Sequence, residues 1–562
     1  MWSNENFILA PLEIKKARKR LFIAFLFIFS IFFSIFFQVL SFPFQENNKL
    51  LLASQITSGL NRANIIDRNG SLMATSIPAW SISAHPNEVL EPDQSAFILH
   101  KLMPEKNLAL LTKKLKSNSK YVEIDRVSSP KRIDLILNSG ITGIHFSKTQ
   151  TRLYPKGNLA SHILGNVNRD GKGLAGIEYK MDGELKSNLN PIQLTIDTNV
   201  QYILESEIKK QIKFFEAKSA AGIVLNIANG EILAISSYPD FDVNYFGEAT
   251  ASQKFNRATF GNYDMGSTFK LINTAIAIDS GSVKLDEKFD TTKPLFFGKH
   301  RIDDFRYLDK PANVAEILVN SSNIGSALIA KKIGPKVQKY YFDLLELTKK
   351  PVLPILEVSK PIFNSKWPKL TSITASYGYG IAVSPIQLAS AISCIFNDGK
   401  FVSPRLIKNK SEIVEKRVFS KKTSLTMRKL ARAVVTHPNG SGKKADAFGY
   451  LVGGKTGTAE IISSSGGFKK NANLASFVGA FPINNPKFLV LALIEEPKPQ
   501  IQKLKHRYTT GGQVAAPVVG KIIKKIAPIL NVHPIVKNLP EIEQTLKLDI
   551  LYNNLEATNA SL

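Results

Sequence analysis

The residues of this chain best suited to chemistry are a serine and a lysine about one helical turn apart. Ser267 and Lys270 follow Gly266 at the start of an apolar run that predicts a helix over Phe269–Asp279. Residues at i and i+3 share a helix face, so we expect Lys270 Nζ beside Ser267 Oγ. A serine hydroxyl is a poor nucleophile without a neighbouring base, and burial lowers the pKa of a lysine enough for that role. The pair therefore predicts acyl transfer through Ser267, helped by the positive end of the helix.

The same spacing of serine and lysine occurs elsewhere without this setting. Ser441 and Lys444 lie in a polar segment rich in glycine and lysine, with no apolar helix behind them. Further examples at this spacing include Ser117 with Lys120 and Ser128 with Lys131. Context, and not spacing alone, therefore favours Ser267 and Lys270.

A second candidate group is Ser321 and Asn323, which precede a predicted helix over Ile324–Lys331. A hydroxyl and an amide two residues apart are suited to relaying a proton and holding a substrate amide. A Ser-Ser-Asn triplet is equally the ordinary N-cap of a helix. Taken alone, the triplet leaves both interpretations open.

The third group, Lys455-Thr456-Gly457-Thr458, has two incompatible interpretations. Together with Gly449 and Gly454 it matches the phosphate-binding P-loop, and the apolar strand Phe488–Glu495 ends in an acid, as a magnesium-holding strand would. A P-loop must open a helix whose first amides bind phosphate. Here Thr458–Ile462 runs into a Ser/Gly-rich segment that is too short and too rich in glycine for such a helix. The pattern disfavours a nucleotide site.

The alternative is an edge strand that lines a cleft. Gly457 has no side chain, so an extended peptide can pair with the backbone there as an added strand. Lys455 supplies a positive charge, and Thr456 and Thr458 supply hydroxyl donors for a terminal carboxylate. The main-chain N–H groups of Ser267 and Thr458 would then form an oxyanion hole.

Composition limits the classes of function. A chain of 562 residues with 44% hydrophobic and 21% charged residues predicts a folded protein of two or more domains. The net charge of +27 is spread along the chain without interleaved aromatics, which favours a solvated lysine-rich surface over nucleic-acid binding. Contact with anionic lipid or an anionic polymer remains open. The single cysteine, Cys394, excludes an internal disulfide and a Cys-rich metal site, and we expect no cofactor and no metal.

The N-terminus predicts a membrane anchor. Basic residues between Lys15 and Arg20 precede the Phe-rich run Leu21–Phe42, which as a helix would be about 33 Å long. The basic cluster before the span places residues 1–20 in the cytoplasm and the bulk of the chain outside it. The alternative is a cleaved signal peptide, but the run is long and no clear cleavage site follows closely.

Beyond the anchor, the pattern predicts an irregular α/β pedestal over residues 43–192, a larger domain over 193–530 and a polar tail over 531–562. The pedestal begins with a hairpin whose Asn69-Gly70 pair favours a type I′ turn. The larger domain is expected to start with a strand at Leu194–Asp197 and an amphipathic helix from Val200. We expect a hairpin over 221–237, further strands at Ala475–Phe481 and Phe488–Ile494, and helices between, including Pro385–Phe396. The fold class is α+β, with distant strands closing a central antiparallel sheet flanked by helices.

The order Ser-x-x-Lys, Ser-x-Asn, Lys-Thr-Gly, with gaps of roughly 50 and 130 residues, resembles the penicillin-binding proteins. The resemblance continues through several further segments. They are Asn64–Gly70, Gly173–Glu178, Ser237–Asn244, Phe255–Ala258, Gly378–Pro385 with Gln387–Ala389, and Tyr508–Pro517. Two positions depart from the usual pattern: Met265 stands where many members have proline, and Ala63 where many have glycine. Neither removes a reactive group.

The single anchor and a pedestal without a glycosyltransferase domain are similar to the class B, septal type of Gram-negative bacteria. The resemblance implies a D,D-transpeptidase of the inner membrane and periplasm that is a target of β-lactams. Ser267 would attack a D-Ala-D-Ala stem peptide, Lys270 would take its proton, Ser321 would pass a proton to the leaving amine, and Asn323 would hold the substrate amide. Expected partners are peptidoglycan stem peptides and other cell-division proteins, including a polytopic glycosyltransferase. An elongation enzyme, a D,D-carboxypeptidase and a silent sensor or scaffold remain alternatives.

Overall fold

The computed structural model describes residues 16, 18–36, 62–188, 190–408, 413–462, 467–500 and 508–551. These form two compact units, each described by itself. The first comprises Met1–Asn61 and Trp80–Thr149, and the second Arg62–Ala79 and Gln150–Leu562. The segment 43–192, expected as one pedestal, is therefore shared between the two units, and the domain limits given above stay a prediction.

The N-terminal helix spans Arg18–Phe36 with a mean hydropathy of 2.1 and no buried residues. It is long and apolar enough to cross a membrane. It overlaps the span expected over residues 21–42 from Leu21 to Phe36 and begins three residues earlier, and residues 37–42 of that prediction lie outside the described residues.

A five-stranded antiparallel sheet forms the centre of the second unit. Its order is β17 (Gly453–Ile462), β18 (Phe468–Phe481), β19 (Phe488–Glu495), β6 (Ser219–Asn226) and β7 (Ile232–Tyr238). Strands from the two ends of the unit are neighbours, since β19 pairs with β6 from Phe488↔Asn226 to Glu495↔Ser219. The predicted hairpin and the two late strands are confirmed, and β17 lies at one edge of the sheet.

The middle strands are apolar on both faces because helices cover both sides of the sheet. In β19, Leu489, Leu491 and Leu493 belong to one hydrophobic cluster, and Val490, Ala492 and Ile494 belong to another. Alternate residues of a strand point to opposite faces, so a continuous apolar run is what a strand between two helical layers requires.

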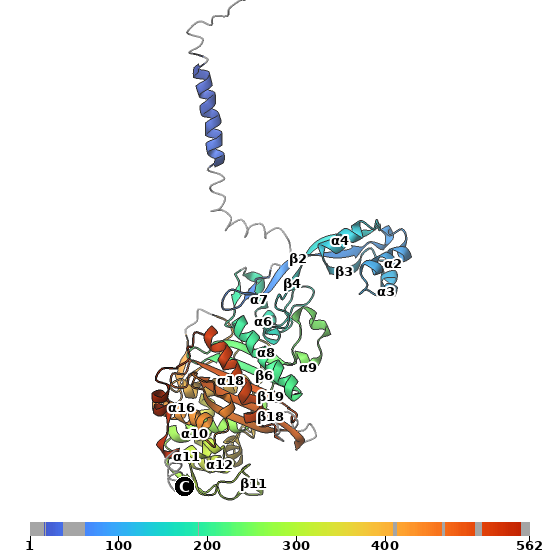
Figure 1. Ribbon diagram of the computed structural model, residues 1–562. Helices are drawn as coiled ribbons and strands as arrows, with labels where there is room; N and C mark the ends of the chain where they lie inside the picture. The colour runs from blue at the N-terminus through green and yellow to red at the C-terminus, as the bar shows by residue number, and fades with distance from the viewer. Residues whose placement is uncertain are drawn as a thin grey trace, which may run out of the picture. The chain divides into compact units, whose positions relative to one another are not determined.

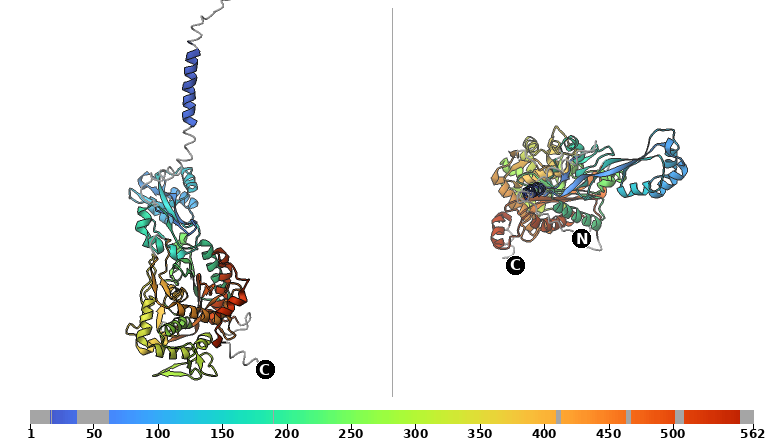
Figure 2. Two further views of the ribbon diagram at one scale, coloured as in Figure 1. Left: turned by 90° about the vertical axis from the view of Figure 1, so that its left-hand side faces the viewer. Right: turned by 90° about the horizontal axis from the view of Figure 1, so that it is seen from above.

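One face of the sheet is covered by α8 (Thr198–Phe215) and α18 (Gly511–Ile529), and the other by α10 (Phe269–Asp279), α15 (Pro385–Phe396) and α16 (Lys421–Thr436). Helices α8 and α18 lie side by side although they come from opposite ends of the unit (Figures 1 and 2). Gln211 Nε2 of α8 donates a 2.5 Å hydrogen bond to Val514 O of α18, 303 residues away. The helices predicted over Phe269–Asp279 and Pro385–Phe396 are confirmed at these bounds.

The remaining elements of the second unit are short or peripheral. They are β1 (Ile65–Ile66), α5 (Ser161–Leu164), α6 (Gly176–Lys180), α7 (Asp182–Ser187), β5 (Ile192–Gln193), α9 (Ala251–Lys254), β8 (Tyr263–Asp264), β9 (Lys288–Phe289), β10 (Leu295–Phe297), β11 (His300–Ile302), β12 (Ala312–Asn313), α11 (Val314–Asn320), α12 (Asn323–Ile333), α13 (Pro335–Leu344), β13 (Ile362–Phe363), α14 (Lys369–Ala375), β14 (Ile381–Val383), β15 (Lys400–Val402) and β16 (Glu415–Arg417).

Two local predictions were wrong. The strand expected at Leu194–Asp197 is instead β5 at Ile192–Gln193, followed by one isolated bridge at Leu194. The hairpin of β1 with β2 (Leu72–Ala84) forms, but a type I′ turn needs positive φ at both central residues and only Gly70 has it. Asp67 determines the turn instead, because its Oδ1 accepts hydrogen bonds from the amides of Asn69 and Ser71.

The segment after residue 530, expected as a polar tail, is in part folded. It contains α19 (Leu539–Leu546), whose Leu546 joins the larger hydrophobic cluster together with Leu551. Glu543 pairs with the buried Arg432 of α16, which also donates to Asp446 Oδ1 at 2.8 Å and Val452 O at 2.7 Å. These contacts tie the segment to α16 and to the chain just before β17, which the polarity of its sequence conceals.

The first unit has its own small core. The end of β2 pairs with β3 (Val122–Ser128) and with β4 (Ile144–Leu153), and α2 (Pro92–Leu102), α3 (Leu108–Leu115) and α4 (Pro130–Leu137) complete it. Ile82, Leu99, Leu111, Ile124 and Ile136 are buried together.

Candidate active site

Ser267 lies in the 3₁₀ turn η4 (Gly266–Thr268), directly before the buried helix α10. Gly266 has φ +55°, and a Cβ there would lie 2.6 Å from Thr458 O of β17. A side chain would push the strand away, so glycine permits the close approach of β17 to this turn. The local sequence thus brings Ser267 and the Lys455–Thr458 strand together.

The Ser-Ser-Asn triplet forms the helix N-cap that its sequence allows, and it also places two of its side chains beside the lysines. Ser322 is the N-cap of α12 and accepts a 2.9 Å hydrogen bond from Gly325 N. Ser321, in the left-handed conformation at φ +60°, connects α11 to that cap. The turn leaves Ser321 and Asn323 facing the lysines.

Two fully buried lysines converge on Ser321 from opposite sides. Lys270 Nζ donates to Ser321 O at 2.5 Å and to Asn323 Oδ1 at 2.7 Å, and lies 3.3 Å from Ser321 Oγ. Lys455 Nζ donates to Ser321 Oγ at 2.9 Å and to Thr456 O at 3.2 Å. The Ser321 hydroxyl is therefore the bridge between the two amines.

Burial makes both amines easier to deprotonate than a free lysine. Desolvation lowers the pKa of Lys270 to about 7, against a smaller opposing effect of the Asp304 carboxylate. The pKa of Lys455 also lies well below its usual value, first because of burial and then because of the Lys270 charge. A pKa near 7 is what a general base needs at neutral pH.

The expected contact between Lys270 and Ser267 is not made. Among the residues that the structure describes, Ser267 Oγ has no hydrogen bond with Lys270, whose amine instead faces Ser321 and Asn323. The α-helix begins only at Phe269 and Ser267 sits on the 3₁₀ turn before it, while the Lys270 amine is held by the oxygens of Ser321 and Asn323. Three oxygens, Ser321 O, Ser321 Oγ and Asn323 Oδ1, lie around the Lys270 amine and match the three donors of an ammonium group.

The Lys455–Thr458 stretch lies in an edge strand and not in a P-loop. It belongs to β17, which runs on to Ile462 with its other edge paired to β18. No helix begins at Lys455-Thr456, so the amides required for phosphate binding are absent from this position. Thr458 Oγ1 accepts a 3.0 Å hydrogen bond from Gly511 N, which fixes the strand to the start of α18.

A scan against family models matches residues 220–524 to the penicillin binding protein transpeptidase domain and residues 58–213 to the penicillin-binding protein dimerisation domain. The chain belongs to the penicillin-binding transpeptidase family. Among curated relatives it is 36% identical over 484 residues to the probable peptidoglycan D,D-transpeptidase FtsI of Caulobacter vibrioides, covering 84% of this chain and 82% of that protein. It is 28% identical to the probable peptidoglycan D,D-transpeptidase PenA of Neisseria meningitidis, covering 87% and 88%.

Solved structures agree on the fold. A peptidoglycan synthetase from Bifidobacterium adolescentis has a TM-score of 0.65 at 21% identity, covering 85% of this chain and 96% of the other. The α+β class, the central antiparallel sheet and the family predicted from the three motifs are confirmed.

Sequence reasoning missed several residues that build this transpeptidase site. Asp304 accepts from Ser322 Oγ at 2.5 Å and from Ile324 N at 3.1 Å, and also from Asn323 N, so it fixes the start of α12. Ser441 was disfavoured as a nucleophile in the sequence analysis. Its Oγ lies 2.7 Å from Thr456 Oγ1, and this hydrogen bond orients the Thr456 hydroxyl of β17. Asp304 belongs to none of the motifs, and the spacing of Ser441 from Lys444 suggested a different role, because both residues approach the site only through the fold.

The space around Gly457 gives a testable consequence. A Cβ there would lie 2.3 Å from Ser476 Oγ, 2.8 Å from Met265 O and 2.9 Å from Thr268 Cγ2. Met265 and Thr268 flank the turn that holds Ser267, so Gly457→Ala is expected to push β17 away from Ser267. We expect at least a tenfold slower penicillin acylation and a loss of about 1–3 kcal/mol in unfolding free energy.

The matched control for that substitution is Gly183→Ala in α7, where the added methyl meets nothing within 4 Å. It should leave acylation unchanged, since alanine is favoured in a helix. Acylation kinetics and thermal unfolding of both variants measure the difference, and equal kinetics would refute the close packing at Gly457.

Proposed function

We propose that this chain is a serine-type peptidoglycan D,D-transpeptidase that works through an acyl-enzyme on Ser267. The observation that carries the proposal is the convergence of two buried lysines on the Ser321 hydroxyl, beside the turn that holds Ser267. The curated relatives named as peptidoglycan D,D-transpeptidases support the same reaction.

The proposed acylation begins with neutral Lys270. It takes the Ser267 hydroxyl proton as Oγ attacks the carbonyl carbon between the two D-alanines of a donor stem peptide. The carbonyl oxygen becomes an oxyanion, for which the N–H groups of Ser267 and Thr458 are the proposed donors. When the tetrahedral intermediate collapses, the C–N bond breaks and Ser321 passes a proton from the lysine pair to the departing amine of D-alanine.

Deacylation repeats these steps in the opposite direction. The amine of a second stem peptide attacks the ester carbonyl, its proton returns through Ser321 to the lysine pair, and Ser267 leaves as the free alcohol. The atoms balance, because one D-alanine is released for each cross-link formed. A β-lactam would acylate Ser267 in the same way and remain attached because its leaving amine stays tethered.

The substrate side of the proposal rests on β17. The edge of β17 that is not paired with β18 is the proposed pairing partner for an extended peptide, along Thr456, Gly457 and Thr458. A terminal carboxylate near Lys455 would favour the charged form of that amine and so oppose the effect of burial on its pKa. Asn323 Nδ2 now donates to Asp303 O at 2.9 Å, and its side chain is the proposed holder of the substrate amide.

We propose a septal role at the cytoplasmic membrane. The helix Arg18–Phe36 follows basic residues, which supports a cytoplasmic N-terminus and a periplasmic catalytic unit. The similarity to FtsI proteins supports partnership with cell-division proteins and a polytopic glycosyltransferase. A tagged chain at mid-cell would support this role, and one along the side wall would favour elongation.

A transfer assay tests the proposed reaction. The purified full-length chain is given a stem peptide ending in D-Ala-D-Ala together with an excess of a labelled D-amino acid as acceptor. We expect the label to replace the terminal D-alanine by mass spectrometry, and to be lost in Ser267→Ala. Release of D-alanine with water as the only acceptor would identify a carboxypeptidase and refute transpeptidation.

A further inference from the structure

Two histidines and a glutamate gather in the first unit, outside the catalytic unit. His85 Nδ1 lies 3.1 Å from Glu88 Oε1, and His145 Nε2 lies 2.9 Å from Glu88 Oε2. The two imidazole rings are 4.0 Å apart between centroids, and the donor atoms of the three side chains all lie within 4.8 Å of one another. Glu88 and His145 are 57 residues apart in sequence, so no local motif marks the group.

The backbone around these side chains is firmly held. His85 N donates to Gly143 O at 2.8 Å, and Glu88 N donates to His85 O at 2.8 Å, which closes the short 3₁₀ turn η2 (Pro86–Glu88). A Cβ on Gly143 would lie 2.8 Å from the carbonyl carbon of Glu88, so the loop before β4 packs directly on that turn. Three donors on a fixed backbone lose little freedom when they bind a common ligand.

Ion pairing alone explains this cluster poorly. The side chains of His85, Glu88 and His145 are 37%, 54% and 48% exposed, and exposed ion pairs contribute little to stability. Two protonated imidazoles stacked at 4.0 Å would also repel each other. Two imidazoles beside one carboxylate are a common donor set for a divalent transition metal.

We propose that His85, Glu88 and His145 form a zinc-binding site on the first unit. Tetrahedral zinc with ligands near 2.1 Å would place donor atoms roughly 3.4 Å apart. The two distances to Glu88, 3.1 and 2.9 Å, are already close to that value, so small side-chain rotations suffice. Three protein ligands leave a fourth position for water or a donor atom from another molecule.

The zinc would cross-link three pieces of the first unit. His85 follows the end of β2, Glu88 ends η2, and His145 is at the start of β4. A metal that binds only the folded form stabilises it by an amount that rises with the logarithm of the free metal concentration above Kd, so zinc is expected to raise the thermal stability of this unit. The site is independent of the lysine–serine chemistry, and the proposal does not rest on the proposed function.

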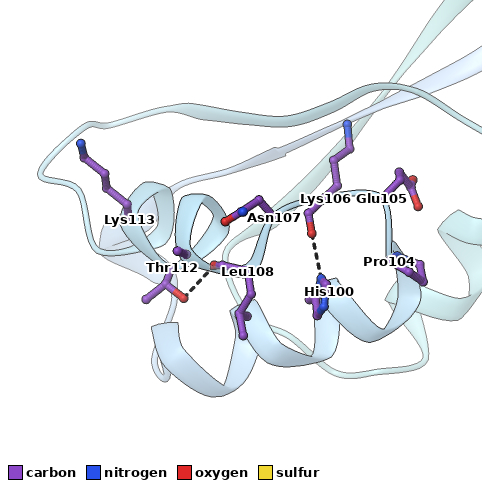
Figure 3. A pocket seen from close by; sticks show the side chains of 9 residues that line it. His100, Pro104, Glu105, Lys106, Asn107, Leu108, Thr112 and Lys113 are labelled. Atoms are coloured by element: carbon purple, nitrogen blue, oxygen red, sulfur yellow. Dashed lines mark hydrogen bonds between the residues drawn. The ribbon is translucent and has the colours of Figure 1, made fainter. Parts of the chain in front are cut away.

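His100, which also belongs to the first unit, provides a matched control. His100 lies in an open pocket between α2 and α3 (Figure 3). Its Nδ1 is 2.8 Å from Lys106 O, and Lys106 and Lys113 line the same pocket. One imidazole nitrogen is already used there, and two cationic side chains oppose a metal ion. His100→Gln should therefore leave zinc binding intact.

The test is calorimetric titration of ZnCl₂ into the chelator-stripped, detergent-solubilised full-length chain. We expect one equivalent of zinc to bind at micromolar or lower concentration and to raise a thermal transition. His145→Gln and Glu88→Gln should each weaken binding at least tenfold and remove the thermal shift, and MgCl₂ should not compete. Measured without zinc, each variant must have the same thermal transition temperature as the parent chain. A variant that fails this check is replaced by His85→Gln.

Three results would overturn the proposal. The first is no binding by the parent chain, and the second is binding that the substitutions at residues 145, 88 and 85 leave unchanged. The third is weakening by His100→Gln as large as that by His145→Gln, since this would indicate scattered surface histidines and not one site.

Discussion

Ser267→Ala is expected to abolish covalent labelling of the chain by a fluorescent penicillin, with at least a roughly 10³-fold drop in acylation rate. The η4 turn carries two hydroxyls, and that of Thr268 is buried and donates to Met265 O at 2.9 Å, so the Ser267 hydroxyl is the one expected to form the acyl bond. It sits beside β17, where Gly266 permits the close approach of Thr458 O. The measurement is the rate of appearance of the labelled band after gel electrophoresis.

The matched control is Ser117→Ala, at another serine followed three residues later by a lysine. Ser117 Oγ donates to Lys114 O at 2.8 Å in the first unit, far in sequence from the lysine pair. It should label at the parent rate. Labelling of Ser267→Ala near the parent rate, or loss of labelling in Ser117→Ala alone, would refute the assignment of the nucleophile.

The parts of the fold that the sequence predicted best are those where a single periodic pattern decides the structure. The apolar run after Ser267 and the run Pro385–Phe396 became α10 and α15 at the expected bounds, because nearly every residue in them is buried. Strands β18 and β19 were recognisable for the same reason. Their alternating faces meet different hydrophobic clusters, so β19 is apolar from Phe488 to Ile494, and Ser476 is the one polar residue between Leu474 and Phe481 of β18.

The predictions that failed depend on contacts between distant residues. The turn at Asn69-Gly70 was assigned from its residue pair, but the Asp67 carboxylate captures two amides and so selects another turn. The segment after residue 530 was predicted to be a polar tail because its sequence shows no partner for Glu543. That partner is the buried Arg432, more than a hundred residues earlier in the chain. Neither partner can be inferred from local periodicity.

The candidate site also combines predictable and unpredictable parts. The motif spacing predicted which residues belong to the site, but the contacts between their atoms depend on the fold. Lys270 was expected at Ser267, yet in the structure its amine bonds Ser321 O and Asn323 Oδ1. Asp304 and Ser441 reach the site from segments with no recognisable pattern, and only the tertiary structure shows that they support Asn323 and Thr456.

The rate of penicillin acylation is expected to rise with pH through about 7 and then to level off. The base is the neutral form of Lys270, whose pKa burial lowers to about 7. Below that pH the amine is an ammonium ion with no lone pair for the Ser267 proton. The rate should fall nearly tenfold for each pH unit on the acid side. Lys270→Arg, which keeps the charge but cannot act as a base, should be inactive throughout.

Asp304→Asn separates the lysine titration from other causes of pH dependence. The Asp304 carboxylate raises the pKa of Lys270, so removing its charge should lower that pKa further and move the acid limb to lower pH. The Asn side-chain oxygen can still accept from Asn323 N and Ile324 N, which preserves the start of α12.

Asp309→Asn, at an exposed position on the same loop, is the matched control and should leave the pH profile of acylation unchanged. Stopped-flow acylation between pH 5 and 9 measures both. If the acid limb of Asp304→Asn stays where it is or moves to higher pH, Lys270 is not the group whose deprotonation limits acylation.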